Sequence, residues 1–546
     1  MGEIIVQLVA VDGLTFNQLA KSVVIRRALK SDGYNLPKSR ATITKIFMEE
    51  RAKVKENLKN KLKALKESGQ RFSLSLDEST SVRNRRYMNL NIHDKNNFYS
   101  LGMVRITGTM NFAKAKDLVA KRLAEFGLEF ESDIVSTITD GAAVMKKFGR
   151  ETAPLHTLCL AHAIHLCVCD VIYKRSEVSQ DQEENEEEHE SEEDCDCEGD
   201  CDCEYEDIND TAFFSNFGEI VSKVRRTIKI FRKSPVNNDD ALQPYVVEAY
   251  GEEKVLFLDC RTRWNSTLKM LKRFYELKKE VQMAMIKLDK PFEISQDEFS
   301  IIKDVCNSLE PIEIAVNYLC QKDADLILSE KIVFFTLKKL AELDTPTSRA
   351  LHRQLTIRVE ERRNVDLIHL VEYLNCPDYL DTASARDQFG RKISKPAVIA
   401  LAASLLQRLY PDTTDGNNAL SERDEGTSNE EQVEDTTIKT VSEEYAEFLL
   451  MPSINATTSS NSGRRKTERT ILKQECSLYE STKTRPENLE KLHKCLLTIK
   501  PTSVEPERAF SVMGLFLTKI RNRLSDNMLD AIIFLRHQYQ LRLKDN

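Results

Sequence analysis

Two aspartates follow short apolar segments and could together hold metal ions for chemistry on phosphate esters. Asp77 follows FSLSL in the stretch Arg71–Thr80, and Asp140 follows the strand-like segment Ile134–Thr139. Carboxylates at the ends of neighbouring strands can flank two Mg²⁺ ions about 3.5–4 Å apart, as two-metal phosphoryl transfer requires. The residues alone leave a simpler interpretation open, with Asp77 as a turn residue and Asp140 as a helix N-cap.

Cysteine and histidine side chains form two further patterns. Cys159 and His162 make a Cys-x-x-His pair at the start of the apolar helix LCLAHAIHLCVCDVIY, which is half of a zinc-site pattern. No convincing second pair lies nearby, so packing on one helix face is the simpler interpretation. Four more cysteines lie among acids in CDCEGDCDC and could bind a metal loosely: Cys195, Cys197, Cys201 and Cys203. The 13 cysteines suit intracellular thiols better than a disulfide framework.

The only tryptophan, Trp264, lies in FLDCRTRWNSTLKML between Arg263 and Asn265, with Arg261 two positions before Arg263. Aromatic rings stack on unpaired bases and arginines hold phosphates, so this segment is a candidate DNA contact. A tryptophan that anchors a helical core is an equally good interpretation. The chain has no Walker loop, dinucleotide glycine pattern, nucleophile elbow or zinc-protease helix, which disfavours nucleotide hydrolysis and serine hydrolase chemistry.

The elements that position these residues begin near Arg71. Three segments with alternating or β-branched patterns, FSLSLD, RRYMNLNIHD and SLGMVRITG, predict an antiparallel meander. A helix over 113–126, the strand Ile134–Thr139, a second helix and a short strand within Thr152–Leu158 complete the series. This is the element order of the ribonuclease H-like fold, in which the first and fourth strands are neighbours. Asp77 and Asp140 are therefore expected to be close in space.

The rest of the chain is predicted to be helical. We expect a helical N-terminal region over 1–69, the first part of a sheet domain over 70–160, a helical insertion over 161–490, and a C-terminal segment over 491–546 that completes the core. Residues 177–210 hold 19 acids and no Lys or Arg, which predicts a disordered tract. Segments 411–440 and 453–470 have the composition of linkers.

The charge balance suits a nucleic-acid partner. The net charge of −8 comes from the acidic tract, because the remainder of the chain is net positive. No apolar run is long enough to predict a membrane span. The first histidine is His93 and the first cysteine is Cys159, so we expect no zinc finger in the first ninety residues.

Taken together, four blocks resemble the hAT superfamily of DNA transposases: SLDEST, TITDGAAVMKKF with LCLAHAIHL, DCRTRWNSTLKML, and SVEPERAFSVMGLFLTKIRNRLS. The resemblance implies a ribonuclease H-like catalytic core interrupted by the helical insertion. It also implies a catalytic and metal-binding triad of Asp77, Asp140 and Glu507, with Mg²⁺ or Mn²⁺ as the cofactor. The family's CxxH motif falls on Cys159 and His162, and its RW motif on Arg263 and Trp264.

The implied partners are transposon-end DNA, contacted by His162, Arg261, Arg263 and Trp264, and a second copy of the chain, bound through about 491–546. The chain departs from the family pattern because the N-terminal BED finger and the paired tryptophans before the last block are absent. The expected function is therefore metal-dependent DNA cleavage and strand transfer by a hAT-type transposase or a derivative. The alternative is a catalytically inactive, dimerising nuclear protein that associates with DNA or chromatin. A nuclear location is expected, and GRRKTER at 463–469 is a candidate import signal.

Overall fold

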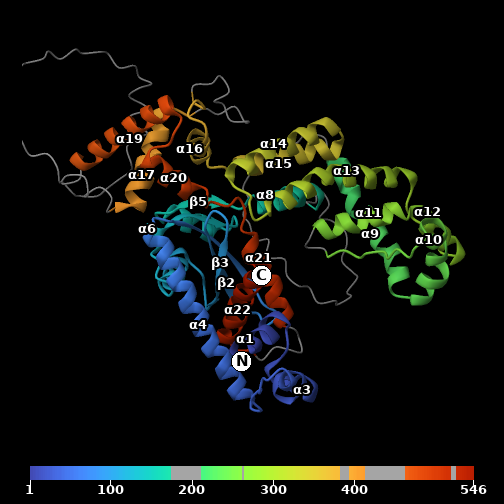
Figure 1. Ribbon diagram of the computed structural model, residues 1–546. Helices are drawn as coiled ribbons and strands as arrows, with labels where there is room; N and C mark the ends of the chain where they lie inside the picture. Colours follow the sequence, from blue (N-terminus) through green and yellow to red (C-terminus); the bar gives the residue numbers. More distant parts are fainter. Residues whose placement is uncertain (174–210, 261–263, 381–392, 412–461, 518–523, 546) are drawn as a thin grey trace, which may run out of the picture.

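A computed structural model describes residues 1–173, 211–260, 264–380, 393–411, 462–517 and 524–545. The predicted acidic tract, with its four cysteines, lies outside these residues, as do nearly all of the predicted linker 411–440 and the first half of the predicted linker 453–470. The second half of that segment, residues 462–470, is helical instead of a linker. Arg261 and Arg263 also lie outside them. Figure 1 shows the described chain as a strand-containing body, from which one group of helices extends to one side while a second group covers the end near β5.

The N-terminal region is helical, as its spacing of apolar residues predicts. Its longest element is α4, which begins after Ser39 and stops just before Gly69. The buried side chains of α4, among them Ile43, Phe47 and Leu62, join the core under the sheet. The elements in order are α1 (Gly2–Val6), the π-helical turn η1 (Gln7–Val11), α2 (Phe16–Lys21), α3 (Val23–Ser31) and α4 (Arg40–Glu67).

The sheet is mixed and has five strands in the order β3-β2-β1-β4-β5. Strand β1 pairs antiparallel with β2 and parallel with β4, which confirms the prediction that the first and fourth strands are adjacent. One expectation was wrong: β1 continues past Asp77 to Thr80, because its pairing with β2 continues to Arg86. The strands are β1 (Phe72–Thr80), β2 (Arg86–His93), β3 (Phe98–Ile106), β4 (Ile134–Thr139) and β5 (Leu155–Leu158).

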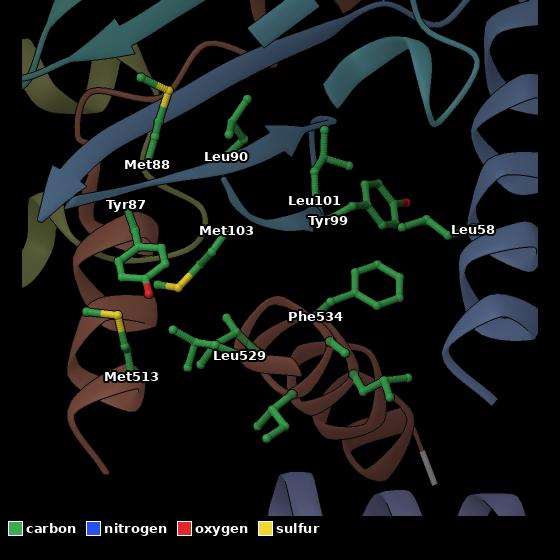
Figure 2. Close-up of a cluster of buried hydrophobic side chains, with 14 of the residues drawn as sticks. Leu58, Tyr87, Met88, Leu90, Tyr99, Leu101, Met103, Met513, Leu529 and Phe534 are labelled. Carbon is green, nitrogen blue, oxygen red and sulfur yellow. The ribbon is translucent and has the colours of Figure 1, made fainter. Parts of the chain in front are cut away.

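Two C-terminal helices pack against one face of this sheet. Figure 2 shows Met513 of α21 beside Tyr87 of β2, Leu529 of α22 beside Met103 of β3, and Phe534 of α22 directed toward Tyr99 of β3. The apolar residues of α22 are thereby buried within their own chain. Helices of the sheet region are α5 (Phe112–Ala124), α6 (Phe130–Asp133), α7 (Ala143–Arg150), α21 (Val504–Phe516) and α22 (Asp526–Asp545).

The intervening chain is helical, as predicted, and builds two further hydrophobic cores. The first contains buried side chains of these elements: α8 (Leu160–Ile172), α9 (Thr211–Arg232), η2 (Asn237–Leu242), α10 (Gln243–Tyr250), α11 (Trp264–Glu276), α12 (Lys278–Lys287), α13 (Gln296–Leu319), α14 (Leu326–Leu343) and α15 (Pro346–Glu360). The second is built mainly by α16 (Val365–Asn375), α17 (Lys395–Leu409), α19 (Ser462–Thr482) and α20 (Glu487–Leu496). This second helical core includes Val135 of β4, which anchors it to the sheet.

No helix in the part of the chain that the structure describes is both long and apolar enough to cross a membrane.

Candidate active site

The register of the central strands places Asp77 beside Asp140. The parallel pairing of β1 and β4 aligns Ser75 with Ile138. Two residues further along each strand are Asp77 and Asp140, where β4 ends and β1 continues. Since adjacent strands lie about 4.7–4.9 Å apart, the two aspartates are neighbours at the carboxyl end of β4. The sheet topology therefore brings together two acids that are distant in sequence.

Both simpler interpretations of these aspartates are wrong. Asp77 is a strand residue that faces Asn89 of β2, and its Oδ1 accepts a hydrogen bond from the amide of Glu78 at 2.8 Å. Asp140 precedes α7 but is not its cap, because the N-cap position is taken by Ala142. The Asp140 Oδ1 instead accepts from the Ala142 amide at 3.2 Å, which fixes the turn between β4 and α7.

The side chain of Asp77 belongs to the polar face of β1. Side chains alternate along a strand, so Asp77 shares a face with Ser73 and Ser75. The Ser73 hydroxyl bonds Thr498 at 2.8 Å, and the Ser75 hydroxyl bonds His93 at 2.7 Å. Residue 498 lies just ahead of α21, a helix that contacts β1 and β2. The chain therefore returns over this face, and the first turn of α21 carries Glu507.

The charges of the other two predicted acids act on Asp77. Burial, followed by the negative charge of Asp140, raises the pKa of Asp77 to about 8, and the charge of Glu507 acts in the same direction. Burial also raises the pKa of Asp140, while its amide bond to Ala142 and the positive charge of Arg362 oppose this. Asp77 therefore lies within electrostatic reach of one carboxylate from the β4–α7 turn and another from α21.

The donor set suits a hard divalent cation. Carboxylate oxygens are the ligands that Mg²⁺ prefers, and a cation would relieve the repulsion that raises the Asp77 pKa. Nevertheless, the described residues contain no group of three or more His, Cys, Asp or Glu side chains gathered as a ligand set. The carboxylates thus fit a metal by their chemistry and shared charge, and the metal assignment stays a prediction.

Cys159 connects this site to the segment that carries Glu507. Its amide donates to the Thr139 carbonyl at 2.8 Å, and its buried sulfur accepts from the Ser503 amide at 3.3 Å. The next amide, of Leu160, donates to the Pro501 carbonyl at 3.0 Å. These bonds hold the end of β4, the start of α8 and the start of α21 together. Cys159 therefore has a structural role in the CxxH motif.

His162 lies one turn into α8 and is half-buried. Its ring centroid is 5.9 Å from that of His165. Burial, then the neighbouring His165 and the charge of Arg362, lower the pKa of His162 to about 4, so its ring is neutral at pH 7. A neutral imidazole can donate one hydrogen bond and accept another. Its predicted contact with DNA is not tested by this geometry.

Trp264 is the first residue of α11 and is only 4% exposed, within the first helical core. The core-anchor interpretation therefore describes this conformation, and stacking on DNA would require the ring to leave its packing. A signal for the burial is present in the sequence, because Trp264, Leu268 and Leu271 follow helical spacing. The DNA-contact assignments of Arg261, Arg263 and Trp264 stay predictions.

One charged residue near the acids was missed. Arg362 lies in the turn between α15 and α16, and 3% of its side chain is exposed. Its Nη2 lies 2.8 Å from the position that a Cβ on Gly141 would occupy, so the guanidinium packs against the turn that holds Asp140. The segment ERRN carries no local pattern that distinguishes Arg362 from Arg363. Only the folding of the helical insertion against the sheet identifies it.

The fold is that of an α/β protein with a mixed five-stranded sheet and a large helical part, and the candidate acids come from β1, the β4–α7 turn and α21. Two family models match this chain: the ZBED1 RNase-like helical domain over residues 208–308 and the hAT family C-terminal dimerisation region over residues 466–539. No curated protein matches the sequence significantly. The two family matches support a hAT-family, transposase-derived protein.

Proposed function

We propose that this chain is a hAT-type transposase or a domesticated derivative, with a ribonuclease H-like core that cleaves and transfers DNA strands at transposon ends. The observation that supports this best is the coupling of Asp77 to both Asp140 and Glu507. Asp77 and Asp140 are neighbours on the sheet, and the burial of Asp77 together with the charges of Asp140 and Glu507 would favour a bound cation. The parallel pairing of β1 with β4 supports the ribonuclease H-like assignment.

In this proposal Asp77, Asp140 and Glu507 hold Mg²⁺ or Mn²⁺. A bound pair of such ions supplies an activated water or 3′-hydroxyl and stabilises the departing oxygen. The chain's own contribution is positioning: β1 fixes Asp77, the Ala142 amide fixes Asp140, and Cys159 ties the α21 segment to the end of β4. His162, neutral at pH 7, would orient a phosphate or an extruded nucleotide by hydrogen bonding.

Self-association and nuclear action form the second part of the proposal. The match to the hAT C-terminal dimerisation region supports self-association. A nuclear location follows from the proposed DNA substrate. The partner is DNA at transposon ends, bound through its backbone by the basic segment around Arg261 and Arg263 and, after rearrangement, by Trp264.

The test is divalent-metal-dependent cleavage of duplexes carrying the candidate terminal inverted repeats that flank the gene. Asp77→Asn should lower cleavage at least about a hundredfold. The loss of a residue that only hydrogen-bonds a metal ligand already costs up to about a hundredfold, and Asp77 is proposed to be a ligand itself. Glu78→Gln is the matched control, because it makes the same charge change one residue away on the opposite face of β1 and should retain cleavage. Comparable cleavage by wild type and Asp77→Asn would refute the triad.

A catalytically inactive nuclear protein that dimerises and associates with DNA or chromatin is the second candidate. The observation that favours it is the absence, among the residues described, of a gathered metal-ligand set, together with the buried Trp264 ring. The same assay separates the two functions. A wild-type chain that binds the terminal repeats but leaves them intact with Mg²⁺ and with Mn²⁺ would establish the inactive form.

A further inference from the structure

Arg362 is an enclosed cation whose donors are poorly satisfied. Its Nε has no hydrogen-bond partner among the described residues, and its Nη1 reaches only Glu361, at 3.5 Å. Burying donors without partners is costly, so such a group normally serves a ligand or a network. Arg363 shows the contrast, because it forms a buried pair with Glu330.

The guanidinium of Arg362 packs against the turn that follows Asp140. The Nη2 approaches Gly141, the residue after Asp140, so closely that a Cβ there would be 2.8 Å away. The positive charge of Arg362 also acts on Asp140 and on His162, which places the guanidinium between the end of β4 and the start of α8. Burial lowers the pKa of Arg362, because the enclosed guanidinium is poorly solvated. A bound anion would therefore stabilise its positive charge.

We infer that Arg362 is the group through which the helical insertion binds a DNA phosphate at the carboxylate site. This inference rests on the proposed function, since it assigns an anionic ligand to that same site. A guanidinium offers a planar fork that matches two phosphate oxygens, and it keeps its charge at every physiological pH. Gly141 leaves room for the guanidinium because it has no side chain. The turn between α15 and α16 carries Arg362 from the helical insertion to the sheet.

The experiment measures binding of the full chain to a short duplex without added divalent metal, over a series of salt concentrations. Arg362→Gln should weaken binding about tenfold or more, irrespective of DNA sequence, and lower the slope of log affinity against log salt by about 1. Arg362→Lys should keep most of the slope while losing part of the affinity, because the charge remains and the fork is lost. Gly141→Ala should weaken binding by displacing the guanidinium.

Two controls separate this role from a structural one. Arg353→Gln removes the same charge from an exposed position on α15 and should leave affinity within about twofold. The melting temperature of Arg362→Gln should stay the same or rise, since an enclosed cation without good partners adds little stability. A lower melting temperature with an unchanged salt slope would show a structural role and overturn the inference.

The outcomes also distinguish this inference from the proposed function. If Asp77-dependent cleavage is observed but Arg362→Gln binds DNA with wild-type affinity and slope, only the phosphate role is wrong. If the wild-type chain neither binds nor cleaves duplex DNA, the proposed function is wrong and the role of Arg362 fails with it.

Discussion

At the scale of single residues, the face of the sheet that carries Asp77 is unusual because its polar side chains are buried and paired. His93 is 3% exposed and shares a 2.7 Å hydrogen bond with Ser75. Burial, together with the nearby charges of Lys500 and His537, lowers the pKa of His93 to about 3. The native fold therefore holds this imidazole neutral in a pH range where the unfolded chain would protonate it.

This difference predicts an acid-dependent loss of stability. Between pH 6.5 and 3 the unfolded state binds one more proton at His93, so the free energy of unfolding falls as the pH falls. From pH 6.5 to 5 the loss attributable to His93 is about 2 kcal/mol. His93→Gln lacks this titration, so it should gain about 2 kcal/mol relative to wild type on going from pH 7.5 to 5. Urea unfolding at the two pH values measures this, and a difference between the two proteins that does not change with pH would contradict it.

The residues of the site differ in how far the sequence could predict them. Asp77 and Asp140 follow strand-like segments, and the strand order makes them neighbours. Glu507 has no such local signal, because it depends on a helix that returns to the sheet after the whole helical insertion, and only the family resemblance pointed to it. Arg362 could not be predicted, since its position depends on tertiary packing between the insertion and the Gly141 turn.

At the scale of elements, the C-terminal helix α22 is locked to the sheet domain by a buried carboxylate. Asp530 accepts from the Met103 amide at 2.8 Å, lies 3.3 Å from Arg122 of α5, and pairs with Arg51 of α4. Gly102 makes room for it, because a Cβ there would lie 2.2 Å from the carboxylate, and its φ of +89° suits glycine. One acid thus joins α22, α4, α5 and the edge of β3.

Asp530→Asn should lower the free energy of unfolding by about 3–5 kcal/mol. The change removes the charge that compensates two largely enclosed arginines, and breaking a buried ion pair from one side leaves an uncompensated charge. Asp526→Asn on the same helix is the matched control, since its pair with Arg85 is substantially exposed and should contribute at most about 1 kcal/mol. Chemical denaturation compares the two variants, and equal losses would contradict the assigned network.

The elements were largely predictable because their signals are local. Alternation and β-branched residues indicated the strands, and the helical pattern over 113–126 indicated α5. The predicted end of β1 was wrong because pairing with β2 sets the length of the strand. The sequence of β1 alone does not show how far that pairing extends. The segment 491–546 was expected to bind a second copy of the chain, whereas the apolar residues of its helix α22 pack against the sheet of their own chain.

At the scale of the whole molecule, the burial of α22 changes where self-association is expected. The region that matches the hAT dimerisation model, 466–539, includes α20 and most of α19 from one core and α21 and part of α22 from another. The apolar side chains of α22 cannot form a second interface without leaving the sheet. The outer face of α19 instead exposes two aliphatic residues one heptad apart, Ile471 at 45% and Leu478 at 51%.

Given the proposed self-association, the double variant Ile471→Asp/Leu478→Asp should convert the full-length chain from the proposed dimer to a monomer. Two charges on that face would have to be buried in a dimer but stay in water in the monomer, so the helix itself should remain folded. Light scattering coupled to size exclusion measures the mass, and circular dichroism checks the helical content. Leu515→Asp, at an exposed position on α21 in the same matched region, is the control and should remain dimeric. Dissociation by Leu515→Asp, with the α19 variant still dimeric, would place the interface on α21 instead.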